Sequence, residues 1–80
     1  MQQYIVSLTK AGRQEASKPL VRFLEHVRAM PAVEVIRIVG DPDNPKRVIM
    51  RAAEDRAADL KTRFGGHLII EVDQELKLMQ

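Results

Sequence analysis

Few residues in this chain have the types and spacing that could carry chemistry. Glu71 and Asp73 form one carboxylate pair, two residues apart on the same side of an extended segment. Such a pair could move protons to and from a substrate, but acid/base catalysis also needs a pocket and a third polar group. The sequence indicates neither, and the same spacing is typical of a solvated strand edge.

The other polar candidates also lack the partners that a reactive site needs. No second histidine follows His26 or His67 at i+3 or i+4, and the chain has no cysteine, so we expect no metal site and no redox chemistry. Ser17 is better explained as a helix N-cap than as a nucleophile, because no G-x-S-x-G motif is present. The glycines do not form a phosphate-binding loop. We therefore expect no catalytic residues, no cofactor and no enzymatic activity.

Length and composition describe one small globular domain spanning residues 1–80. Hydrophobic residues make up 45% of the 80 positions, and the net charge is only +2. Acidic and basic residues are interspersed, which argues against a nucleic-acid surface. The apolar runs are too short for a membrane span, and the N-terminus lacks the pattern of a signal peptide. We expect a cytoplasmic protein without nucleic-acid or membrane partners, or a secreted one if the chain is cut from a precursor.

Hydrophobic periodicity places these residues on strands and helices. Four segments alternate apolar and polar residues as strands do: residues 3–9, 33–39, 47–52 and 67–73. Two helices are expected, one from Ser17 to just before Pro31 and one over residues 53–64. Their buried stripes comprise Leu20, Phe23, Leu24, Val27, Leu60 and Phe64. Residues 10–16 are expected to form a loop, and residues 40–45 a turn.

The order βαββαβ predicts an α+β, ferredoxin-like sandwich. Its four-stranded antiparallel sheet has both helices on one face, so the other face is open to solvent. Strict alternation assigns Ile36 and Ile38 to the covered face. It assigns five aliphatic residues to the open face: Ile5, Val35, Val39, Ile49 and Ile69. Because solvated sheet faces are usually more polar, we expect a partner or a second copy to cover this face.

The last seven residues, 74–80, extend beyond the final expected core position. They contain no turn residue and no helix cap. Residues 76–79, LKLM, carry three apolar side chains and one lysine. An extended apolar terminus of this kind is suited to lie in the groove of another protein.

Both ends of the chain resemble a known family. The opening YIV at residues 4–6 and the closing EVDQELKLM at residues 71–79 resemble the subtilisin propeptides and propeptide-like protease inhibitors. Members of that family begin with a similar strand and have a βαββαβ fold. Their last strand carries an E-x-D pattern, and an extended tail follows it.

The resemblance implies a specific mode of binding to a subtilisin-type serine protease. In that family the open sheet face packs on two parallel helices of the protease, whose N-termini are capped by the E-x-D carboxylates. Glu71 and Asp73 match those caps. The tail would lie in the substrate cleft as an added strand, with Leu76 in an apolar pocket, Lys77 and Leu78 next, and Met79 in the primary specificity pocket.

Two interpretations of function follow. The resemblance implies a domain that inhibits a subtilisin-type protease or assists its folding as an intramolecular chaperone. The alternative is a self-associating ferredoxin-like regulatory domain, a homodimer whose open faces pair and which binds a small metabolite. Gly12 in the first loop is the one feature that supports metabolite binding. Inhibition by a monomer favours the first interpretation, and a tight dimer favours the second.

Overall fold

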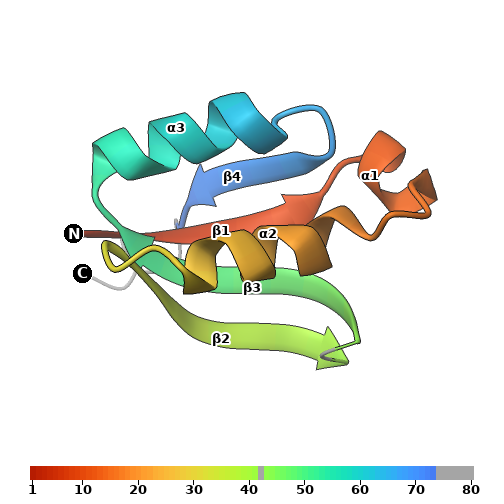
Figure 1. Cartoon of the computed structure of the whole chain (residues 1–80), viewed down its shortest axis with the longest axis horizontal. Coiled ribbons are helices and arrows are strands. Elements are labelled where there is room, and N and C mark those ends of the chain that lie inside the picture. Colours follow the sequence, from red (N-terminus) through yellow and green to blue (C-terminus); the bar gives the residue numbers. More distant parts are fainter. Residues whose placement is uncertain (42, 74–80) are drawn as a thin grey trace.

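The computed structural model describes residues 1–41 and 43–73 and confirms the predicted α+β architecture. In chain order, its elements are β1 (Gln2–Leu8), α1 (Lys10–Gln14), α2 (Pro19–Arg28), β2 (Val33–Asp41), β3 (Asn44–Ala52), α3 (Glu54–Phe64) and β4 (Leu68–Val72). The strands form one antiparallel sheet in the order β2-β3-β1-β4. Helices α2 and α3 lie side by side over one face of this sheet (Figure 1). None of the helices described is long and apolar enough to cross a membrane.

The two crossover connections explain why the helices share a face. β1 and β2 both pair with β3, and β3 and β4 both pair with β1, in each case antiparallel. The chain therefore joins β1 to β2 through α2, and β3 to β4 through α3, as two parallel crossovers. Because such crossovers are right-handed, they place both helices on the same side of the sheet. The opposite side is left without a covering element among the described residues.

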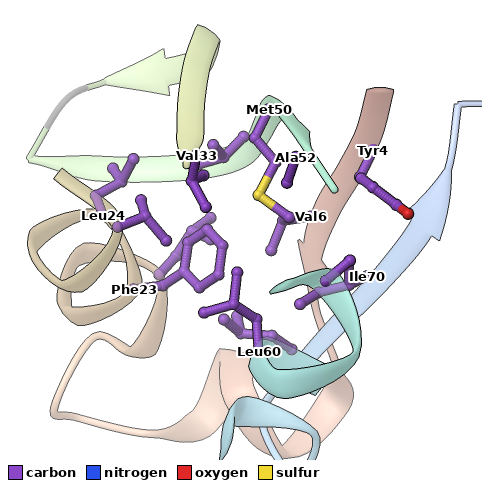
Figure 2. Close-up of a cluster of buried hydrophobic side chains, with 14 residues drawn as sticks. Tyr4, Val6, Phe23, Leu24, Val33, Met50, Ala52, Leu60 and Ile70 are labelled. Atoms are coloured by element: carbon purple, nitrogen blue, oxygen red, sulfur yellow. The ribbon is translucent and has the colours of Figure 1, made fainter. Parts of the chain in front are cut away.

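The core lies between this sheet and the two helices. Two cross-strand rows face the helices: Ile70, Val6, Val48 and Ile38, and beside them Val72, Tyr4, Met50 and Val35. Phe23 of α2 and Leu60 of α3 converge on Val6 and Met50 (Figure 2). Phe23 is 0% exposed, and the centroid of its ring lies 5.3 Å from that of Phe64 in an edge-to-face arrangement. The predicted helical stripes are thus buried, except that Phe64 is only half-buried.

A β-bulge in β2 overturns two of the predicted face assignments. Val35 is paired with Met50, but the next paired residue is Arg37, opposite Ile49, so Ile36 is an extra residue in the strand. Val35 consequently packs against the core, and Ile36 is 42% exposed. The assignment of Val35 to the open face and of Ile36 to the core was wrong because strict alternation does not allow for an inserted residue.

The segment between β1 and α2 is more ordered than predicted. Residues 10–16, expected to form a loop, contain the short helix α1, and the Thr9 hydroxyl at its N-cap accepts a 3.0 Å hydrogen bond from the Gly12 N–H. Ser17 is not the N-cap of α2. That position belongs to Lys18, which has a left-handed backbone with φ of 50° and no side-chain capping bond. Pro19 occupies the first turn of α2, where its missing N–H costs little.

Gly12 is required because α1 packs closely against His67, the residue just before β4. The Thr9 N–H donates a 2.9 Å hydrogen bond to the His67 carbonyl, and this bond brings α1 close to that carbonyl. A Cβ atom at Gly12 would overlap the His67 carbonyl oxygen. The glycine therefore has a packing role, and it no longer supports a metabolite site.

We expect Gly12→Ala to lower the free energy of unfolding by about 1–3 kcal/mol, the usual cost of forcing extra volume into a packed site. Urea denaturation of the variant and the parent chain measures this loss. Gly66→Ala is the matched control, because a Cβ at Gly66 meets nothing within 4 Å. Equal losses at the two glycines would show that α1 does not hold this close contact.

Candidate protein-binding surface

The open face of the sheet consists of three cross-strand rows that the strand register fixes. Read from β4 to β2, the first row is Ile69, Ser7, Arg47 and Val39, and the second is Glu71, Ile5, Ile49 and Arg37. The third is Asp73, Gln3, Arg51 and Glu34, in which the Asp73 N–H donates to the Gln3 carbonyl at 3.0 Å. These rows alternate with the core-facing rows, so their side chains point away from α2 and α3.

Four aliphatic side chains lie on this face, two at its centre and one toward each edge. Ile5 and Ile49 are directly paired in the middle of the second row. Ile69 on β4 and Val39 on β2 lie one row away, at the two ends. We call these four residues the aliphatic band. Ile69 is 39% exposed, and the other three are half-buried.

Four of the five aliphatic residues predicted for the open face are therefore there, Val35 being the exception. A shallow pocket beside the band includes Ser7, Arg47 and both of its ends, Ile69 and Val39, in its lining. Ser7 and the exposed Arg47 lie between these two apolar residues in the first row.

Charged residues border the band at both edges of the sheet. Glu71 on β4 and Arg37 on β2 lie at opposite ends of the second row, and both are exposed. In the third row, Arg51 Nη1 lies 3.8 Å from Glu34 Oε2 in an exposed ion pair. The second row thus carries a negative charge at one edge, two isoleucines in the middle and a positive charge at the other edge.

The two carboxylates predicted to act together lie in different surroundings. Glu71 is exposed, whereas Asp73 is 6% exposed and its Oδ2 accepts a 2.8 Å hydrogen bond from Gln3 Nε2. Gln3 was not among the predicted site residues. No sequence pattern links position 3 to position 73, and only the pairing of β1 with β4 brings them together. Of the pair, Glu71 is the carboxylate that is exposed on the open face.

The predicted tail residues Leu76, Lys77, Leu78 and Met79 lie outside the residues that the structure describes. Comparison with protein-family models, with curated proteins and with solved structures found no match to this chain. Function is therefore inferred from the open face itself.

The two histidines, His26 and His67, contact other side chains of the same chain. The centroid of the His26 ring lies 5.7 Å from that of Phe64 in an edge-to-face arrangement, on the helical side of the domain. His67 Nε2 lies 3.6 Å from Glu15 Oε2, next to α1. Within residues 1–41 and 43–73, no three His, Cys, Asp or Glu side chains are grouped so that they could hold a metal ion. On the open face, the aliphatic band lies between exposed Glu71 and exposed Arg37.

Proposed function

We propose that this chain is a non-catalytic binding domain that inhibits a subtilisin-type serine protease or assists its folding. The observation that carries the proposal is the aliphatic band on the uncovered sheet face, with exposed Glu71 at its β4 edge. Residues 74–80 follow β4 in the sequence. The resemblance of residues 4–6 and 71–79 to subtilisin propeptides supports the choice of partner.

The chemistry of the face suits a surface made of helices. Helix side chains would pack on Ile5, Ile49 and the two ends of the band, and a helix N-terminus would meet Glu71. The first N–H groups of a helix have no partner within the helix, and the helix dipole favours a carboxylate there. Asp73, held by Gln3, would fix the end of β4, after which the chain continues into residues 74–80.

The magnitudes indicate that the face alone cannot give tight inhibition. Complete burial of an aliphatic side chain contributes about 1.5–3 kcal/mol, and three of the four band residues are already half-buried, so about 1 kcal/mol each is realistic. Association costs roughly 4–15 kcal/mol in lost translational and rotational freedom. The proposed function therefore also needs main-chain hydrogen bonds and side chains that fill pockets of the protease. Residues 74–80 would supply both by lying in the substrate cleft.

We expect Ile49→Lys to weaken inhibition of a subtilisin-type protease at least about tenfold, because the new charge would be buried between the aliphatic band and the protease. Folding should be retained, since the residue points away from the core. Ala58→Lys, on the exposed side of α3, adds the same charge away from the open face and is the matched control. The measurement is the inhibition constant of each purified variant, together with its thermal melting curve. Equal inhibition by both variants would contradict docking through the open face.

A further inference from the structure

We propose that the open face also binds a second copy of this chain, forming a weak two-fold symmetric dimer. The proposal goes beyond the proposed function, because it concerns the same face but does not require a protease. It rests on the order of charges and aliphatic residues in the second row of the open face, which runs Glu71, Ile5, Ile49, Arg37. That order is complementary to itself.

A two-fold axis parallel to the strands, passing between β1 and β3, produces the complementary arrangement. When two open faces meet about this axis, β1 lies over β3 of the other copy and β4 lies over β2, while each row stays opposite its own equivalent. Ile5 then meets Ile49 of the other copy at the centre, and Glu71 meets Arg37 of the other copy at the edge. Symmetry repeats each contact, so the interface contains two attractive charge pairs around an aliphatic centre. Sheets that pack face to face with nearly aligned strands are a common arrangement.

The charges also select this axis over the other simple one. A two-fold axis across the strands would place β4 on β4 and β2 on β2. Glu71 would then face Glu71, and Arg37 would face Arg37, in the middle row of the interface. Like charges placed opposite each other at an interface cost several kcal/mol, so this second arrangement is disfavoured.

The third row and the size of the face limit the strength of the dimer. Asp73 would approach Glu34 of the other copy at the rim, although each has an intrachain partner in Gln3 and Arg51, respectively. With strands about 4.8 Å apart and about 3.3 Å per residue along the seven residues of β1, the face is about 20 Å wide and about 23 Å long. Two such faces would bury roughly 900 Å² in total. Such an interface is smaller than the roughly 1,200–2,000 Å² of stable complexes. We therefore expect association at roughly 10 µM to 1 mM chain, in competition with any protease that uses the band.

Sedimentation velocity of the 80-residue chain across that concentration range tests the proposal. Glu71→Arg and Arg37→Glu each turn both symmetry-related pairs repulsive, so each should weaken self-association at least about tenfold. The double variant Glu71→Arg/Arg37→Glu restores opposite charges and should recover it. Asp59→Arg and Lys61→Glu, at exposed positions of α3, make the same changes in net charge away from the face and should leave self-association as in the parent chain. Glu71→Gln, which removes the charge without reversing it, should have an intermediate effect.

The expected pattern is a parent chain whose mass rises toward a dimer, with loss in both single variants and recovery in the double variant. A parent chain that remains monomeric throughout overturns the proposal. So does a dimer that the single reversals leave intact, or one that the double variant fails to restore. Thermal melts confirm that each variant is folded. Protease inhibition is measured separately, so failure of the dimer leaves the proposed function standing, and the reverse also holds.

Discussion

Replacing Phe23 with alanine is expected to lower the free energy of unfolding by about 3–5 kcal/mol, the usual cost of removing a buried aromatic ring. Phe23 is fully buried where α2 faces the sheet (Figure 2). Its ring and that of Phe64 on α3 are in edge-to-face contact. Domains typically have only about 5–15 kcal/mol of stability, so this one change should remove a large part of it. Urea denaturation followed by circular dichroism measures the loss.

Phe64→Ala is the natural comparison, because it removes the same ring from a half-buried position at the edge of the core. We expect a clearly smaller loss than at Phe23. A loss below about 1 kcal/mol for Phe23→Ala, or a larger one at Phe64, would mean that α2 does not cover the sheet as described.

Deleting residues 76–80 is expected to abolish inhibition of a subtilisin-type protease. Under the proposed function, the deletion removes the side chains that fill two pockets of the protease, together with a set of main-chain hydrogen bonds. The described core is formed by residues between Tyr4 and Ile70, with Val72 packed against it, so the shortened chain should still fold. The measurements are the inhibition constants and melting curves of the intact and shortened chains. Equal inhibition by the two would contradict a role for the C-terminal residues in the cleft.

Glu71→Gln and Asp73→Asn give the scale against which that deletion is compared. A carboxylate at a helix N-terminus is worth about 0.3–1 kcal/mol, and up to about 2 kcal/mol when partly buried. We therefore expect roughly two- to thirty-fold weaker inhibition for Glu71→Gln, whose carboxylate is exposed, and a smaller loss for Asp73→Asn, whose carboxylate is 6% exposed and held by Gln3. Both losses should be less than that of the deletion. Asp73→Asn should also reduce stability slightly, since it removes the charged acceptor of the Gln3 hydrogen bond, whereas Glu71→Gln should not.

Most of the fold could be predicted because its signals are local and periodic. The stripe of Leu20, Phe23 and Val27 in α2 recurs at helical spacing, and all three are buried. Alternation in β1, β3 and β4 assigned the correct faces because those strands pair without an inserted residue along the predicted site. The element order then left one topology with both helices on one face.

The differences arose where distant parts of the chain meet. The bulge at Ile36 is set by the pairing of β2 with β3, and alternation within β2 alone could not reveal it. Gly12 and Thr9 form α1 against the carbonyl of His67, a residue more than fifty positions away. The hydrogen bond of Gln3 to Asp73 likewise joins the two ends of the described chain. Such contacts depend on register and three-dimensional proximity, which single-sequence patterns do not contain.

The most direct test of docking through the open face is to follow the isoleucine methyl groups by NMR. The chain would be labelled at these methyls and titrated with a subtilisin-type protease whose nucleophilic serine is replaced by alanine. The account predicts that the signals of Ile5, Ile49 and Ile69 shift or broaden on binding, while those of Ile38 and Ile70, on the helix-covered face, change little. Unchanged signals at all five positions, or changes confined to Ile38 and Ile70, would contradict it.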